Sequence, residues 1–535
     1  MRSSLPCLLA LVAAVSGNRS TAQEYFFRSY VTGLSSLGSS LTPGANGEMH
    51  VTGITSTNDG TDQLLMTVGP SGDPLVSRTL DTELDEFPRR VITIAPGRLL
   101  LMGSAGHNAD PYEKDMVLIK TGTTGNNGQM QAWGTPDSAE VFADVVQTGA
   151  DLVLLGSSEY ERDADRPAFF LMRCDTAYNV AWSTSVNFST DLHLGMATAL
   201  AADGSIYALG CLDPDSDGQP VEGVLALMKF TANGTLQWTR KYDVPGNMLI
   251  TRIDMRVVND GSVYFMQNYN VNGSGIALFH VAENGDLLWC KHLQAPPPQS
   301  LQFTRILLHD DVLYLAGSYG FGSASRDPVL LQCTTAGAVN WARMYGSDET
   351  TGDLLDLCIS DAPGASPALW AVGVLRPTSS DPQQMFVMKL DLDGHGLPNC
   401  ERQELVITAT DEVPVITTLT PEVIPYNSPR THMLSMATAE MDMFTACITT
   451  GITEAEPAQT GIYPNPTTAL CTLTFPDRAP RHVAVFDATG RELHVVVTPG
   501  TGRVQVDLGG HEHGVYFVRA TDAAGRSAVH RVVMQ

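Results

Sequence analysis

The feature that most restricts the fold of this chain is a phrase that recurs about every 50 residues. Each copy has a β-rich stretch ending in Gly, a variable loop, a second apolar stretch, a short turn and a last strand. The clearest copy runs from Gly204 to Tyr242. The closing position of the first stretch is occupied, in order, by Gly53, Gly103, Gly156, Gly210, Gln267, Gly317 and Gly373. The repeat is therefore read seven times.

An aromatic residue marks the last strand of most copies. Val76 occupies this position in the first copy, and the later ones have Trp133, Trp182, Trp238, Trp289 and Trp341. A repeat of this length with about four short strands is the signature of a β-propeller blade, which buries its faces against its neighbours. Gly and Asn turns and β-branched residues favour strands over helices. The sequence therefore predicts an all-β fold, a seven-bladed β-propeller.

The seventh copy lacks its last strand. Pro398 stands where Trp238 stands in the fourth copy, and proline cannot donate a hydrogen bond to a central ladder. A matching strand, YFFRSY from Tyr25 to Tyr30, lies near the start of the chain and places Phe26 in the tryptophan position. We expect this segment to complete the seventh blade and close a propeller of residues 23–400, leaving no open sheet edge at that point.

Residues 1–22 have the layout of a secretory signal peptide. Arg2 precedes an apolar run from Leu5 to Val15, and small residues lead to a predicted cleavage after Ala22. The run is shorter than the roughly 20 residues of a spanning helix, and no later segment comes closer, so we expect no transmembrane segment.

The region after the repeats divides into three parts. Residues 401–450 are weakly patterned, and we interpret them as a β-rich bridge with one or two strands. The acidic, proline-containing residues 451–460 are typical of a linker. Residues 461–535 alternate apolar and polar side chains between Asp, Gly and Pro turns, which predicts a small antiparallel β-sandwich.

This last segment resembles the type A sorting domain of the type IX secretion system of the Bacteroidota. The resemblance rests on a series of motif residues in order: Tyr463, Pro464, Asn465, Pro466, the turn at Gly490, Gly514, Tyr516 and the closing Arg531. It implies passage through the periplasm, export by the type IX machinery and removal of the domain by a sorting peptidase. The protein would then be secreted or held at the outer cell surface. The alternative is an ordinary accessory sandwich.

The charge of the chain limits its partners. Without Arg2 and Arg19 the chain keeps 30 basic and 58 acidic residues, a net charge of −28. Such a surface repels phosphate backbones and anionic membrane faces, so nucleic acid is excluded as a partner.

The cysteines are scattered singly and define no metal site. Cys400 and Cys447 bracket the bridge in a chain bound for an oxidising compartment, which makes a disulfide between them a reasonable expectation.

The motifs of metalloproteases, serine hydrolases and P-loop enzymes do not occur in the sequence. One local pattern points to Ca²⁺: Asp213, Asp215 and Asp217 alternate around a Gly turn, with Glu222 following. An acidic loop without metal is the alternative. No other cofactor is indicated.

Two functions remain open from the sequence. The first is a non-catalytic secreted propeller that binds a protein, glycan or polymer through its loops. The second is a propeller enzyme, a hydrolase or lyase, which requires carboxylates or histidines converging on the central tunnel. The absence of a catalytic motif favours the binding protein.

Overall fold

The computed structural model describes residues 25–535 except for the segments 32–33, 58–59, 83, 107–113, 135–137, 162–167, 189–192, 213–223, 245–246, 249–252, 271–273, 297–299, 321–325, 348–349, 363–364, 379–380, 397–399, 425–428, 431–434, 439–440, 446–460, 475–481, 489–490, 501–502 and 522–526. The described residues form strands and turns, with no helix among them. They divide into two compact units, one ending at Cys447 and one comprising Ile448–Gln535. The predicted signal peptide lies outside the described residues.

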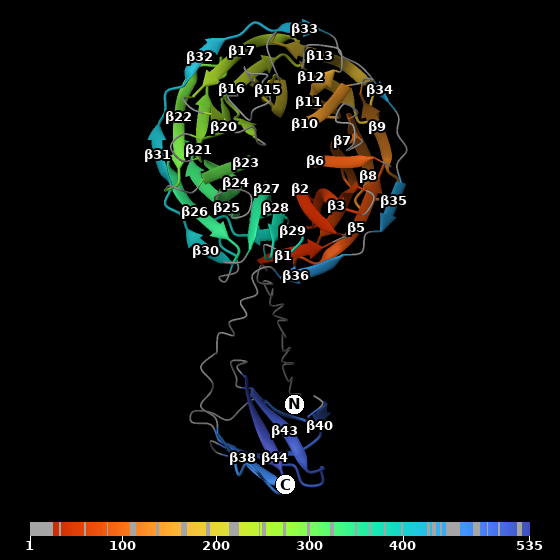
Figure 1. Cartoon of the computed structure of the whole chain (residues 1–535), viewed down its shortest axis with the longest axis vertical. Coiled ribbons are helices and arrows are strands. Elements are labelled where there is room, and N and C mark those ends of the chain that lie inside the picture. The colour runs from red at the N-terminus through yellow and green to blue at the C-terminus, as the bar shows by residue number, and fades with distance from the viewer. Residues whose placement is uncertain are drawn as a thin grey trace, which may run out of the picture. The chain divides into compact units, whose positions relative to one another are not determined.

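The first unit is a seven-bladed β-propeller, as the sequence predicted (Figure 1). Each blade is an antiparallel sheet whose strands follow one another from the channel outwards. The strands are β2 (Ser35–Pro43), β3 (Met49–Ser56), β4 (Thr61–Val68) and β5 (Pro74–Asp81) in blade 1; β6 (Asp85–Ala95), β7 (Arg98–Gly106), β8 (Lys114–Gly122) and β9 (Gln129–Trp133) in blade 2; β10 (Ser138–Thr148), β11 (Asp151–Glu161), β12 (Ala168–Asp175) and β13 (Val180–Asn187) in blade 3; β14 (His193–Leu200), β15 (Ile206–Leu212), β16 (Val224–Phe230) and β17 (Leu236–Asp243) in blade 4; β18 (Asn247–Met248) and β19 (Met255–Val257), then β20 (Val263–Asn270), β21 (Ser274–Val281) and β22 (Leu287–Gln294) in blade 5; β23 (Ser300–His309), β24 (Val312–Gly320), β25 (Arg326–Thr334) and β26 (Val339–Tyr345) in blade 6; and β27 (Thr351–Ser360), β28 (Ala368–Arg376), β29 (Gln384–Leu390) and β1 (Phe26–Val31) in blade 7.

The N-terminal strand closes the ring, as expected. Strand β1 pairs with β29 of blade 7, with Phe26 opposite Lys389, and the chain then enters blade 1 through β2. This is the same register in which Trp238 faces Lys229 in blade 4. Phe26 and Tyr30 are buried at the boundary with blade 1, and the Tyr30 hydroxyl donates a hydrogen bond of 2.6 Å to the carbonyl oxygen of Gly72.

The repeated Gly is explained by a β-bulge in the innermost strand. Six innermost strands have a bulge opposite this position, in all blades except blade 5. A Cβ on Gly53 would lie 2.0 Å from the carbonyl oxygen of Leu37, and one on Gly317 would lie 1.9 Å from that of Gln302. Gln267 replaces the Gly in blade 5, where the innermost strand is split into the short β18 and β19.

The aromatic position of the last strand holds neighbouring blades together. The indole rings of Trp182, Trp238, Trp289 and Trp341 each lie against the glycine of a tight turn in the next blade. Trp133 does not occupy the aromatic position that the sequence pattern assigned to it. It pairs with Met116, which is the position of Tyr242 in blade 4, four residues beyond the tryptophan position. The tryptophan position of blade 2 is occupied instead by Gln129, opposite Lys120.

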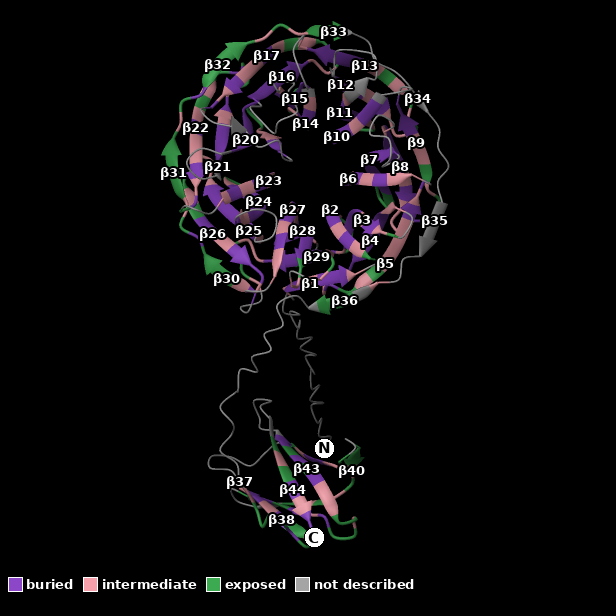
Figure 2. Cartoon of the chain, viewed as in Figure 1, coloured by how far each residue is buried: buried purple, intermediate pink, exposed green. Residues whose placement is uncertain are grey.

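Strands β30 to β36, which lie between residues 401 and 445, form a belt around the blades (Figure 1). Each belt strand pairs antiparallel with the outermost strand of one blade, in the order of blades 6, 5, 4, 3, 2, 1 and 7. The expected bridge of one or two strands is instead seven short strands: β30 (Glu401–Glu404), β31 (Thr408–Asp411), β32 (Val415–Thr418), β33 (Glu422–Ile424), β34 (Pro429–Arg430), β35 (Ser435–Thr438) and β36 (Asp442–Thr445). Every blade thus gains one outer strand from the belt, and the belt is mostly exposed (Figure 2).

The apolar core lies between the blades. Seven separate clusters of buried side chains each join two adjacent blades, one cluster at every blade boundary, or seam. A blade therefore cannot bury its own faces and depends on both neighbours, as in other repeat architectures.

The second unit is the expected small β-sandwich. Its two four-stranded antiparallel sheets enclose one apolar core. The first sheet has β37 (Gly461–Tyr463), β38 (Leu470–Thr474), β42 (Arg503–Asp507) and β41 (Val496–Gly500), and the second has β40 (Glu492–Leu493), β39 (His482–Phe486), β43 (Gly514–Thr521) and β44 (Ser527–Met534).

Candidate functional site

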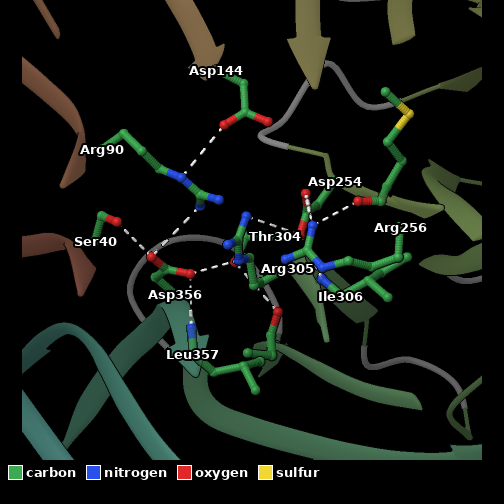
Figure 3. Close-up of polar contacts among 12 residues, drawn as sticks. Ser40, Arg90, Asp144, Asp254, Arg256, Thr304, Arg305, Ile306, Asp356 and Leu357 are labelled. Atoms are coloured by element: carbon green, nitrogen blue, oxygen red, sulfur yellow. Dashed lines mark hydrogen bonds and ion pairs between the residues drawn. The ribbon is translucent and has the colours of Figure 1, made fainter. Parts of the chain in front are cut away.

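One position of the innermost strand carries most of the charge at the centre of the propeller. It is the residue just after the bulge, or the equivalent residue in blade 5, and its occupants in blades 1 to 7 are Ser40, Arg90, Asp144, Ala197, Asp254, Arg305 and Asp356. In blade 5 this residue directly precedes β19. The charged side chains at this position and that of Arg256 point toward one another from blades 2, 3, 5, 6 and 7 (Figure 3). Three guanidinium groups and three carboxylates therefore converge.

The ion pairs of this central cluster connect adjacent blades and, in one case, blades 2 and 7 across blade 1. Arg305 pairs with Asp254 at 3.0 Å and with Asp356 at 2.6 Å. Arg90 lies between Asp144, at 3.5 Å, and Asp356, at 3.8 Å. Arg256 pairs with Asp254 at 2.9 Å and also donates to the carbonyl oxygen of Met255. The charges of the six side chains cancel, so the cluster needs no added ion for neutrality.

Each carboxylate also accepts a backbone N–H from the next blade. Asp144 accepts from Thr198, Asp254 from Ile306 and Asp356 from Leu41, at 3.0 to 3.1 Å. Asp356 additionally accepts hydrogen bonds from the Ser40 hydroxyl, at 2.6 Å, and from the N–H of Leu357, at 2.9 Å (Figure 3).

The protonation states follow from these contacts. Burial by itself would raise the pKa of Asp254, but Arg256, Arg305 and Arg90 outweigh it and hold that pKa below its ordinary value. Burial and the neighbouring charge of Arg305 lower the pKa of Arg256 to about 10. Asp254 is therefore an anion near neutral pH, which suits an ion pair and not a proton donor.

A shallow hollow of about 800 Å³ lies between blades 4 and 5, away from the central cluster. It is lined by the indole of Trp238, the amides of Gln237 and Asn284, and Leu288, whose side chain is 53% exposed. Lys229 and Glu283 also line it and form an ion pair of 2.6 Å.

A separate acidic group lies at the seam of blades 1 and 2. One carboxylate oxygen from each of Asp62, Asp81 and Glu86 lies within 4.8 Å of the others. Glu86 is buried, and burial raises its pKa to about 8, with Asp81 and Asp62 adding to the rise and hydrogen bonds from Thr82 opposing it. The sequence did not reveal this group, because Asp62 lies 19 residues before Asp81 and joins it only through the pairing of β4 and β5, while Glu86 belongs to the next blade.

The Ca²⁺ candidates from the sequence, Asp213, Asp215, Asp217 and Glu222, lie outside the described residues. The proposed disulfide stays a prediction for the same reason. Cys400 is buried at the boundary of blades 6 and 7, whereas Cys447 is not among the described residues.

The motif residues of the C-terminal unit gather around its last strand. The Asn465 side chain donates to the carbonyl oxygen of Arg531 at 2.7 Å and accepts from the N–H of Val533 at 2.9 Å. Tyr516 is buried in the sandwich core, and its hydroxyl donates to the carbonyl oxygen of Glu512. Tyr463 is half exposed and precedes Pro464 and Pro466. Gly514 is the first residue of β43. Gly490 lies outside the described residues.

Among the described residues, no helix is long and apolar enough to cross a membrane. No curated protein sequence matches the chain.

Several solved structures resemble the propeller. An α-L-arabinofuranosidase from Fusarium graminearum is 10% identical, with a TM-score of 0.40, and the match covers 58% of this chain and 98% of that one. A protein of unknown function from Dyadobacter fermentans is 10% identical, with a TM-score of 0.41 and coverage of 58% and 95%. The endosialidase of phage phi92 is 12% identical, with a TM-score of 0.39 and coverage of 80% and 95%. At this identity the likeness carries no information on activity.

The C-terminal unit has a match of its own. Residues 461–535 match the family model described as a secretion system C-terminal sorting domain, the segment in which the sequence motifs lie. The chain therefore ends in a sorting domain that follows a seven-bladed propeller.

Proposed function

We propose that the propeller is an exported binding protein whose ligand is an extracellular glycan, polymer or protein. The observation that carries this proposal is the state of the central carboxylates. Both oxygens of Asp356 are occupied by hydrogen bonds and ion pairs, and Asp254 is held as an anion between two guanidinium groups. Such groups stabilise the ring and are poorly suited to act as a nucleophile or a proton donor.

The hollow between blades 4 and 5 is the binding region that we favour. The Trp238 ring and exposed Leu288 offer apolar surface, and the Gln237 and Asn284 amides offer donors and acceptors. A concave surface of this mixed kind suits a ligand with apolar faces and hydroxyl edges, as sugars have. A net charge of −28 disfavours polyanionic ligands.

A direct test is binding of the purified protein to arrays of neutral and acidic glycans and to surface extracts. We expect a neutral glycan to bind. The double variant Gln237→Ala, Asn284→Ala should lower the affinity for that glycan at least tenfold. Asn126→Ala, which changes an exposed residue of a turn in blade 2, is the matched control and should bind as the parent does. Unchanged affinity of the double variant would move the binding region elsewhere.

A second candidate function is a hydrolase or lyase acting at the central channel. It is favoured by the convergence of Asp144, Asp254 and Asp356 from three blades, the arrangement that such an enzyme requires. Asp144 has the loosest ion pair of the three. If the protein cleaves a polysaccharide, Asp144→Asn should abolish turnover in a protein that still folds. Turnover that survives this change would exclude catalysis by Asp144.

We further propose that the sorting domain directs the propeller through the type IX machinery and is then removed by a sorting peptidase. The match of residues 461–535 to the sorting-domain family supports this route.

A further inference from the structure

The acidic group of Asp62, Asp81 and Glu86 differs from the central cluster because it brings like charges together. Strands β4 and β5 pair with Gln63 opposite Leu80, so Asp62 and Asp81 follow at the next pair of positions. Like charges directly opposite each other destabilise a sheet. Glu86, at the start of β6 in blade 2, adds a third carboxylate, with an oxygen within 4.8 Å of one from each aspartate.

One carboxylate oxygen of Glu86 accepts hydrogen bonds that fix the side chain, and the other oxygen accepts none. Glu86 is 2% exposed to solvent. Oε1 accepts hydrogen bonds from the backbone N–H of Thr82, at 2.8 Å, and from the Thr82 hydroxyl. Oε2 is buried and has no hydrogen-bond partner within the described part of the chain. A buried carboxylate oxygen without a partner is costly, so this position calls for a cation or a proton.

We propose that Asp62, Asp81 and Glu86 bind one Ca²⁺ at the seam of blades 1 and 2. Oxygen ligands lie 2.3–2.6 Å from Ca²⁺, so ligands on opposite sides of the ion are about 5 Å apart, and three oxygens within 4.8 Å of one another can all reach one ion. Mg²⁺ gives up its water reluctantly and is usually bound through one or two carboxylates, so three protein carboxylates favour Ca²⁺. Asp62 and Asp81 are half-buried, which leaves room for water to complete the coordination.

The ion would connect two blades. Asp62 and Asp81 belong to blade 1 and Glu86 to blade 2, and the chain passes from one blade to the other between Thr82 and Asp85. A cation that binds the folded state alone raises the folding equilibrium constant by a factor of 1 + [Ca²⁺]/Kd. Sites of extracellular modules have Kd values on the order of 10⁻⁴ to 10⁻³ M.

The test compares the full mature chain with Glu86→Gln, which keeps the shape of the side chain and removes its charge. After treatment with EGTA, Ca²⁺ binding is measured by calorimetry and the melting temperature is followed at increasing Ca²⁺. We expect the variant to bind one Ca²⁺ fewer than the parent. At ten times the Kd, Ca²⁺ should favour the folded parent about elevenfold.

Without Ca²⁺ the order of stability should reverse. In EGTA, Glu86→Gln should melt at or above the parent temperature, because burial and the nearby Asp81 and Asp62 disfavour a charged carboxylate at this position. The double variant Asp215→Asn, Asp217→Asn is the matched control, because it removes any Ca²⁺ bound by the acidic loop. Addition of Glu86→Gln to this double variant should still reduce the number of bound Ca²⁺ ions by one.

Three results would overturn the proposal. They are equal Ca²⁺ stoichiometry in the parent and Glu86→Gln, no binding by the parent at 10 mM Ca²⁺, and an equal shift of melting temperature by Mg²⁺. If Glu86→Gln fails to fold, Asp81→Asn serves as the second variant under the same criteria.

Discussion

At the scale of single residues, the central aspartates resolve a problem that the bulges create. A bulge removes a backbone group from the ladder. In blades 4, 6 and 1 a backbone N–H group just after the bulge donates instead to a carboxylate of the preceding blade. The donors are Thr198, Ile306 and Leu41, and the acceptors are Asp144, Asp254 and Asp356, respectively. The arginines then neutralise the buried carboxylates. A buried ion pair is costly to break, because the remaining partner keeps its charge without compensation.

We predict that Asp254→Asn lowers the free energy of unfolding by roughly 3–5 kcal/mol at pH 7, since it leaves Arg256 and Arg305 with an excess of buried charge. The folded-state pKa of Asp254 lies below its unfolded value. Its contribution is therefore complete above about pH 4 and is lost as the pH falls through the folded pKa. Urea unfolding from pH 7 to pH 3 should show a steeper acid loss in the parent than in the variant.

The exposed Asp73, which pairs with Arg28, provides the control for Asp254. Its side chain is 58% exposed, so Asp73→Asn should cost less than about 1 kcal/mol. Equal costs at the two positions would show that the central cluster contributes no more than a surface ion pair.

The repeated Gly could be predicted from the sequence, and the charged position of the innermost strands could not, for a physical reason. The repeated Gly is visible because a Cβ at this position would clash in each of these blades, with the bulged backbone in blades 1, 2, 6 and 7 and with a phenylalanine ring in blades 3 and 4. The charged position is invisible to a search for repeats, because its occupants are complementary across the ring and not alike from blade to blade. Ser40, Ala197, Arg90 and Asp144 all occupy it.

At the scale of elements, strand β1 is the one on which closure depends. It pairs with β29 on one side and with belt strand β36 on the other. Its residues Phe26 and Tyr30 join the core between blades 7 and 1, and Phe27 joins the core between blades 6 and 7. This strand therefore contributes to two apolar clusters and two ladders.

We predict that deletion of residues 25–30 destabilises the propeller severely. The loss of each buried aromatic side chain costs about 3–5 kcal/mol, and β36 loses its partner as well. Thermal unfolding should show a much lower melting temperature or aggregation. Deletion of Gln23 and Glu24, which precede β1, is the control and should leave the melting temperature unchanged. A truncated protein that melted with the parent would contradict closure by β1.

The belt escaped detection because its strands lack the pattern that identifies a strand. Strands β31 and β32 have four residues each, and all eight side chains are exposed. With neither face packed on a core, nothing enforces alternation of apolar and polar residues. Backbone pairing to an existing edge holds these segments, and that interaction is independent of side-chain type.

At the scale of the whole chain, the sorting domain is predicted to act as a detachable unit. Its two sheets pair only among their own described strands and enclose their own core. Removal of residues 461–535 should leave the propeller folded, with an unchanged melting temperature, but held in the periplasm. Fusion of this segment to a periplasmic reporter should send the reporter to the cell surface or medium of a host with the type IX machinery.

Fractionation and immunoblotting measure both outcomes. Replacement of Asn465 by Ala in the fusion removes the two hydrogen bonds to the last strand and should reduce export. A fusion that stays in the periplasm would refute the sorting role, and the propeller would be unaffected by that result.

The direction of the belt also determines how the ring tolerates damage. The blades follow one another from 1 to 7, while the belt returns in the opposite sense from blade 6 through blade 1 to blade 7. The seam between blades 7 and 1 is crossed by the passages from β1 to β2 and from β35 to β36. The seam between blades 6 and 7 is crossed from β26 to β27 and from β29 to β30. Every other seam is likewise crossed once by the blades and once by the belt. A protease that cuts this chain at any single peptide bond therefore leaves each seam crossed by at least one intact segment of backbone. A single cut should not separate the blades at any seam.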